Sequence, residues 1–206
     1  MQVWRIVCLA AGYGAGSFLT AVWAARIFAE KEISQIGTGN PGMANVMANI
    51  GKKEGALVLA GDLVKVVIAC MICQLLFQEH SFEEISLYTG FGAILGHNYP
   101  LWRKGKGGKG VAVTCAWLTL AFFPYGLLCC IAGGAAVLLT KSLAFGAVVI
   151  PFFGCVAAFL QGEGDAKILA VLSLLLMFLK HREGLEELLH KKQKTGMSSI
   201  FENVPK

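Results

Sequence analysis

The residues best suited to chemistry lie in one segment, Gly96 to Lys109, between long apolar runs. Gly107 and Gly108 allow backbone conformations that a Cβ would forbid, and their successive N–H groups can form an anion-binding nest. Lys106 and Lys109 flank these glycines and supply point charges for a phosphate. Simple enrichment of basic residues in a loop requires neither the paired glycines nor their register with the lysines. The pattern therefore predicts a phosphate-binding loop at a membrane surface.

Two histidines and one ion pair are further candidates. His97 ends an apolar run just before the basic loop, where a neutral imidazole can orient or deprotonate a hydroxyl. His181 and Arg182 close the last apolar run and can bind an anion, although positive-inside bias would also place them there. Asp62 and Lys65 lie inside an apolar run, three residues apart on one helix face. Such residues are costly in a membrane, so the pair either orders the bundle or contacts substrate, with Lys65 neutralising it.

A second glycine-rich segment covers residues 37–53. Gly39 and its neighbouring glycines free the backbone, and Thr38 and Asn40 offer side-chain donors. Such a loop can wrap a polyhydroxy phosphate. A Gly-Asn-Pro-Gly run is also an ordinary turn, so this segment by itself leaves both interpretations open.

The composition indicates a membrane protein. Of 206 residues, 56% are hydrophobic and only 15% are charged, whereas a soluble domain usually carries about 25% charged residues. The net charge of +5 comes from loops and the C-terminus, where membrane topology explains it, and no nucleic-acid-binding motif accompanies it. All seven cysteines fall in apolar runs, which favours packing over metal binding or disulfides. We expect no metal and no cofactor.

Seven apolar spans predict an all-α, polytopic membrane protein. They cover about residues 3–28, 55–77, 84–100, 110–123, 125–139, 143–160 and 166–181, with a turn at Pro124. If the N-terminus is outside, the basic loop residues segregate to one face and the C-terminus is cytoplasmic. Residues 1–182 then form a single integral-membrane domain, and residues 183–206 form a polar cytoplasmic tail with spacing suited to a short surface helix.

Taken in order, these motifs resemble one family. The motifs are Gly16-Ser17, the segment 37–53, Asp62 with Lys65, Gly96-His97, Lys106 to Ala112 and His181-Arg182-Glu183. Their order is similar to that of the PlsY family, the bacterial acyl-phosphate:glycerol-3-phosphate acyltransferases. The resemblance implies a seven-helix enzyme of the bacterial plasma membrane. It implies transfer of a fatty acyl group from acyl phosphate to the sn-1 hydroxyl of glycerol 3-phosphate, giving lysophosphatidic acid and phosphate for phospholipid synthesis. No metal and no acyl-CoA are implied.

The residues and the resemblance together suggest roles for the site. His97, Lys106 and Lys109 are the catalytic candidates: the lysines would hold phosphate, and His97 would orient a reacting group or act as a base. The substrate-binding candidates are Thr38, Gly39, Asn40, Asn45, Lys65, Gly107, Gly108, His181 and Arg182. The acyl chain would lie in an apolar groove between helices, within the bilayer.

Several positions depart from the family pattern that the resemblance implies, and four of them bear on the expected site. Ala48 stands where the family usually has arginine, and Ala144 where it commonly has serine, while Gly184 and Glu187 replace an asparagine and an arginine. Each lost charge-assisted hydrogen bond typically costs about 1.5–3 kcal/mol, so the glycerol-phosphate side is weakened more than the acyl-phosphate side. Two alternatives follow: a paralogue that binds acyl phosphate or phospholipid with little turnover, and an acyltransferase with a different acceptor.

Overall fold

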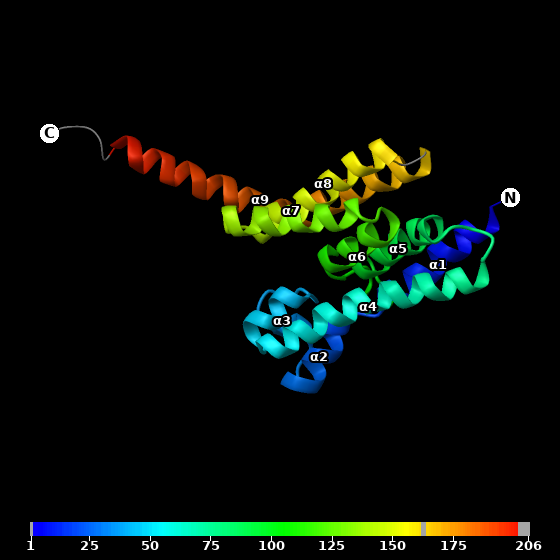
Figure 1. Cartoon of the computed structure of the whole chain (residues 1–206). Helices are drawn as coiled ribbons and strands as arrows, with labels where there is room; N and C mark the ends of the chain where they lie inside the picture. The colour runs from blue at the N-terminus through cyan, green and yellow to red at the C-terminus, as the bar shows by residue number, and fades with distance from the viewer. Residues whose placement is uncertain (1, 162–163, 202–206) are drawn as a thin grey trace.

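The computed structural model describes residues 2–161 and 164–201. Within these ranges the chain forms nine α-helices and two short 3-10 helices (Figure 1). Their bounds are α1 (Val3–Ser17), α2 (Thr20–Ala29), η1 (Ile33–Gln35), α3 (Met43–Asn49), α4 (Lys52–Leu76), α5 (Phe82–Asn98), η2 (Leu101–Arg103), α6 (Val111–Ala121), α7 (Tyr125–Thr140), α8 (Leu143–Gln161) and α9 (Gly164–Phe201).

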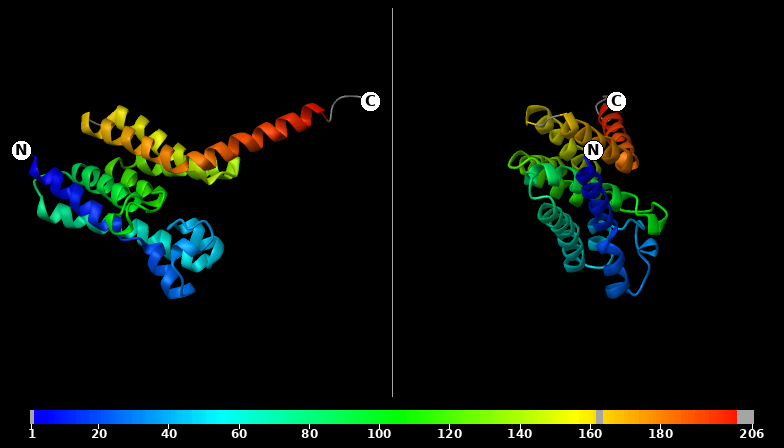
Figure 2. Two further views of the ribbon diagram at one scale, coloured as in Figure 1. Left: turned by 180° about the vertical axis from the view of Figure 1, so that it is seen from behind. Right: turned by 90° about the vertical axis from the view of Figure 1, so that its right-hand side faces the viewer.

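The helices pack in two groups. α1, α4, α5 and α6 form the first group, and α7, α8 and the first part of α9 form the second (Figure 1). α2 and α3 lie with the beginning of α4 at one end of the first group. The C-terminal part of α9 projects away from both groups, as the views in Figure 2 show.

α5 is the central helix, and most of its residues are buried. It begins with a capping box made by Ser81 and Glu84. Its close partner is α1, and the contact uses two pairs of glycines, Gly12 and Gly16 on α1 and Gly92 and Gly96 on α5. A Cβ at any of the four would collide with the backbone of the facing helix. Small residues let membrane helices approach closely, and here they bring the ends of α1 and α5 together.

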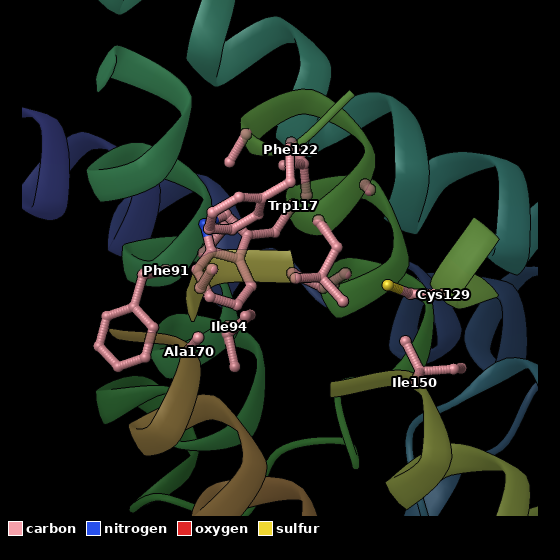
Figure 3. Packing of buried hydrophobic residues seen from close by; sticks show 14 of the residues in the cluster. Phe91, Ile94, Trp117, Phe122, Cys129, Ile150 and Ala170 are labelled. Atoms are coloured by element: carbon pink, nitrogen blue, oxygen red, sulfur yellow. The ribbon is translucent and has the colours of Figure 1, made fainter. Parts of the chain in front are cut away.

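An apolar core joins the two groups. Trp117 of α6 is fully buried and packs against Phe91 of α5 and against Phe122 (Figure 3). Its indole N–H donates to the carbonyl of Leu87 at 3.0 Å, so the polar atom of the ring is satisfied within the core. Ile150 of α8 belongs to the same cluster, which fixes the second group against the first.

The helical prediction is confirmed. Each of the seven predicted spans coincides with helix in the described ranges, and the turn at Pro124 separates α6 from α7. Three segments there are long and apolar enough to cross a membrane, namely Val3–Ala29, Lys52–Leu76 and Leu143–Gln161. α6 and α7 are shorter apolar helices. Crossing by all seven spans, and the N-terminus outside, stay predictions.

Three details differ from the sequence-based expectation. Extended backbone at Phe18 and Leu19 interrupts the first span and separates α1 from α2. The segment 37–53 is not a loop throughout, because it contains α3. The polar tail does not begin with a separate short helix: α9 continues past residue 182, since the leucines, glutamates and lysines there favour helix. Residues 202–206 of the predicted tail lie outside the described residues.

Candidate functional site

Polar side chains hold the break between α1 and α2. A helix that stops leaves its last carbonyls without intrahelical partners. Lys65 of α4 donates from Nζ to the carbonyls of Gly16, at 3.2 Å, and Phe18, at 2.8 Å. The indole N–H of Trp102 donates to the carbonyl of Ser17 at 2.8 Å. The break is therefore stabilised by groups from α4 and η2, far away in sequence.

The same ammonium group joins Asp62 to His97. Lys65 Nζ lies 2.8 Å from Asp62 Oδ1 and 3.0 Å from His97 Nδ1. Thr20 Oγ1 donates to the same carboxylate oxygen at 3.2 Å. Asp62 and His97 are 3% exposed and Lys65 is 9% exposed. With two carbonyls, a carboxylate and an imidazole around it, Nζ already has an acceptor for each of its three N–H groups. This geometry favours the interpretation in which the ion pair orders the bundle.

Gly107 and Gly108 lie directly against His97. The N–H of Gly108 donates to the carbonyl of His97 at 2.9 Å. A Cβ on Gly108 would overlap His97 Nε2, and a Cβ on Gly107 would overlap the His97 carbonyl oxygen. Neither glycine has a positive φ, so the expectation of special backbone conformations here is wrong. These glycines provide space beside the imidazole. The Gly108 N–H group donates to the His97 carbonyl, so it is not available to bind an anion as the predicted nest requires.

The N-terminus of α6 offers hydrogen-bond donors to an anion. Its N-cap is Gly110, with φ of 81° and no side chain to cap the first turn. Asn98 lies against Gly110, and its fully buried side-chain amide has no hydrogen-bond partner within the described ranges. Free N–H groups and the helix dipole make such an end attractive to phosphate. Asn98 is a candidate that the sequence did not single out.

Two side chains fix the start of the basic loop. Lys180 of α9 donates to the carbonyl of Asn98 at 2.8 Å, and its Nζ lies 4.0 Å from the centre of the Tyr99 ring. The hydroxyl of Tyr13 donates to the carbonyl of Tyr99 at 2.7 Å and accepts from the N–H of Leu101 at 3.1 Å. Neither Lys180 nor Tyr13 was predicted as a site residue, because only tertiary structure brings them to the loop.

Lys109, Lys180 and His181 lie near one another beside the α6 N-terminus, and we call these three residues the basic group. His181 is buried, and its Nδ1 lies 3.0 Å from the carbonyl of Met177. Lys109 is half-buried and close enough to Lys180 and His181 for its charge to act on both. The structure therefore brings the end of α5, the glycine segment and the α9 histidine to one place.

Lys106 and Arg182 lie at the margin of this group. Both are exposed. The carbonyl of Lys106 accepts a hydrogen bond from Arg103 Nε at 3.1 Å, which folds the loop back on itself.

The remaining predicted residues form a second group on the loop before α3. Asn45 is its centre: its Oδ1 accepts from the N–H of Thr38 at 3.0 Å, and its Nδ2 donates to the carbonyls of Ile36 and Asn40 at 2.9 and 3.1 Å. Asn45 thus shapes the loop, while the Thr38 side chain is exposed. Gly39 has φ of 71°, which favours glycine. Among the described residues, no hydrogen bond or ion pair joins this group to the glycine segment.

The four positions that depart from the family pattern lie in different parts of the structure. Ala48 is exposed on α3, beside the second group. Gly184 of α9 lies against Ala144 of α8, and a Cβ at Gly184 would come 2.9 Å from that of Ala144. Two of the replaced polar positions therefore meet as a pair of small residues. Glu187 is exposed.

Comparisons with known proteins decide the family. A model of the glycerol-3-phosphate acyltransferase family matches residues 6–191. This chain belongs to that family. It is 32% identical to glycerol-3-phosphate acyltransferase 1 of Lactobacillus johnsonii, over 87% of this chain and 86% of the relative. It is 31% identical to glycerol-3-phosphate acyltransferase of Ruegeria pomeroyi, over 90% of this chain and 88% of that relative. The PlsY resemblance in the motifs is thereby confirmed, and the chain belongs to an enzyme family.

The fold is also that of a solved membrane protein. The glycerol 3-phosphate form of PlsY (YgiH), an integral membrane glycerol 3-phosphate acyltransferase, superposes with a TM-score of 0.76 at 24% identity, over 91% of this chain and 92% of that chain. Its lysophosphatidic acid form gives a TM-score of 0.75 at 25% identity over the same shares. In the part of the chain that the structure describes, the protein is accordingly all-helical and has the fold of an integral membrane protein.

Proposed function

We propose that this protein is an acyl-phosphate-dependent glycerol-3-phosphate acyltransferase of the bacterial plasma membrane. The observation that carries the proposal is the basic group at the α6 N-terminus, where Lys109 and the buried amide of Asn98 meet free helix N–H groups. Such a site suits the phosphate of an acyl phosphate. Membership of the family suggests the acceptor, glycerol 3-phosphate, and the lysophosphatidic acid form of PlsY suggests the product.

The chemistry needs little more than positioning and charge. The acceptor hydroxyl oxygen bonds to the acyl carbon, the bond from that carbon to the bridging phosphate oxygen breaks, and phosphate leaves with the electron pair. The hydroxyl proton passes to the departing phosphate or to a histidine. Lys109 and the α6 N-terminus, with Lys106 from the rim, neutralise charge that grows on the phosphate. Because an acyl phosphate is already activated, holding the two substrates together supplies much of the acceleration.

An apolar groove between α1 and α4 fits the acyl chain. It has a volume of about 250 Å³ and is lined by Ala11, Ala15, Phe18, Lys65, Ile68, Ala69 and Ile72. These positions repeat at helical spacing, so the groove follows both helices away from Lys65, the neighbour of His97. Another groove, between α7 and α8, includes Cys129 and Leu160 but no residue of the basic group.

A chain-length series tests this groove. Ala15→Leu fills its middle and should lower turnover of long acyl phosphates several-fold more than turnover of short ones. The matched control is Ala10→Leu, on the same helix but outside the groove. Equal effects of both variants at every chain length would remove the groove from the account.

The second group, centred on Asn45, is proposed to receive glycerol 3-phosphate. Thr38 offers an exposed hydroxyl, and Asn40 and the freed backbone around Gly39 offer further donors. The exposed Ala48 leaves this group without the arginine that the resemblance implies. That loss is the observation that keeps a different acceptor, or a binding protein with little turnover, as the second candidate.

Product analysis decides between these functions. Purified protein in lipid vesicles is given acyl phosphate with glycerol 3-phosphate, with glycerol, or with no acceptor. The proposal expects lysophosphatidic acid and phosphate in equal amounts, and only with glycerol 3-phosphate. Transfer to glycerol alone would support a different acceptor. Absence of transfer by folded, monodisperse protein at saturating substrates would contradict the proposal and favour a binding role.

A further inference from the structure

The contact between Lys65 and His97 has a chemical consequence for the imidazole. Lys65 is paired with Asp62 at 2.8 Å and donates to two backbone carbonyls, as a charged ammonium group does. An ammonium group has N–H donors and no acceptor. Its contact of 3.0 Å with His97 Nδ1 therefore requires Nδ1 to accept. A neutral imidazole with Nδ1 as acceptor carries its proton on Nε2.

The second nitrogen of His97, Nε2, faces the glycine segment. Gly108 lies so close to Nε2 that a Cβ there would overlap it, and Nε2 has no hydrogen-bond partner within the described ranges. Gly108 is two residues before Gly110, the N-cap of α6. The Nε2–H group is therefore available to donate a hydrogen bond to a ligand held at the glycine segment.

His181 has the opposite arrangement. Its Nδ1 lies 3.0 Å from the carbonyl oxygen of Met177, one turn earlier on α9. A carbonyl oxygen can only accept, so Nδ1 carries the proton and Nε2 keeps a lone pair. Both histidines are buried, at 3% and 5% exposure, so these partners are not in competition with bulk water.

We infer that Lys65, oriented by Asp62 and Thr20, is a positioning residue that fixes His97 as a hydrogen-bond donor through Nε2, while the Met177 carbonyl fixes His181 as an acceptor. The inference rests on the proposed function for its meaning in catalysis. His97 then stabilises an oxygen of the acyl phosphate and does not act as the base. His181 is the histidine able to accept a hydrogen bond from the acceptor hydroxyl. The buried ion pair acts on the reaction through the tautomer of His97.

Nitrogen-15 NMR of the histidine rings tests the inference directly. The protein, labelled at its histidines, is measured in lipid vesicles near neutral pH. The chain has four histidines, and replacing His80 and His190 with glutamine leaves only the two of interest. We expect one ring protonated at Nε2 and one protonated at Nδ1. His97→Gln should remove the Nε2–H signal set. A His97 ring protonated at Nδ1, or at both nitrogens, would overturn the inference.

Variants of Lys65 connect the tautomer to catalysis. Lys65→Met removes the ammonium group and leaves the Asp62 carboxylate, whose Oδ1 lies 3.8 Å from His97 Nδ1 in the wild type, to attract the ring proton to Nδ1. Turnover should fall about 100-fold, as when one oriented donor to a developing oxyanion is removed, with the KM for glycerol 3-phosphate little changed. Lys65→Arg restores a donor and should recover both the Nε2–H tautomer and part of the turnover. If Lys65→Met does not fold, the His97 tautomer measured in the wild type and in Lys65→Arg still tests the inference.

The inference and the proposed function can fail separately. Expected tautomers in a protein that transfers no acyl group would refute only the function. Active enzyme with His97 protonated at Nδ1 would refute only the inference. A Lys65→Met variant that keeps the Nε2–H tautomer but loses turnover would show that the lysine acts by another route, and would also overturn the positioning role.

Discussion

The two groups proposed to bind phosphate, one around His97 and one around Asn45, are built in different ways. Around His97 the side chains are buried and linked across helices, with Lys65 joining α1, α4 and α5 through four contacts. Around Asn45 the hydrogen bonds are local, within residues 36–49, and the neighbouring Thr38 and Ala48 are exposed. A buried network constrains each member, because removing one leaves the others unpaired. The exposed side chains of this second group can be lost at little cost in stability, and one residue implied by the family pattern, the arginine at position 48, is missing there.

The largest expected effect comes from closing the space beside His97. Gly108→Ala places a methyl group on the imidazole, so the glycine segment or the ring must move, and turnover should fall about 100-fold or more. The control is Gly14→Ala, where a Cβ meets nothing within 4 Å. Steady-state kinetics with both variants measure the difference. Near-normal turnover in Gly108→Ala would mean that the buried residues around His97 are less constrained than their contacts indicate.

Charge removal separates the centre of the basic group from its rim. Lys109→Ala should lower kcat/KM for acyl phosphate about 10–100-fold, the loss typical of one charge-assisted hydrogen bond. Lys106→Ala should lower it less, because Lys106 is exposed. Lys104→Ala serves as a control on the same loop. A larger loss for Lys106 than for Lys109 would reverse the assignment of the two lysines.

Restoring the arginine at position 48 should strengthen the binding of glycerol 3-phosphate. Ala48 is exposed on α3, so Ala48→Arg can be accommodated without disturbing the core. One added charge-assisted hydrogen bond should lower the KM for glycerol 3-phosphate about tenfold and leave the KM for acyl phosphate unchanged. Ala44→Arg, one turn earlier and also exposed, is the matched control for charge alone. An unchanged KM in Ala48→Arg would mean that another residue clamps the phosphate or that the acceptor differs.

A smaller effect is expected at Thr38. Thr38→Ser keeps the hydroxyl and should leave the kinetics within about twofold, whereas Thr38→Val removes it and should raise the KM for glycerol 3-phosphate about fivefold. Both variants should unfold near the wild-type temperature, because Asn45 holds the loop, whereas the hydroxyl accepts only a long, exposed hydrogen bond from the Asn40 N–H, at 3.4 Å. Equal kinetics of Thr38→Ser and Thr38→Val would remove the hydroxyl from the acceptor site.

The sequence predicted the helices well because apolar runs and turn residues are local signals. It also located the basic loop, since Lys109 and the glycines are adjacent in the chain. It did not predict the break at Phe18, because Lys65 and Trp102 satisfy the freed carbonyls from distant positions. Nor could it identify Lys180 or the reason for Gly108, which depend on how α5 and α9 lie against the loop.

The most direct test of the account is to titrate both substrates against wild-type protein in vesicles and follow phosphate release. We predict release that requires glycerol 3-phosphate, that saturates readily with acyl phosphate, and that needs a higher concentration of glycerol 3-phosphate to saturate than the Ala48→Arg variant does. Release that is independent of glycerol 3-phosphate, or a folded protein that leaves acyl phosphate intact, would contradict the account.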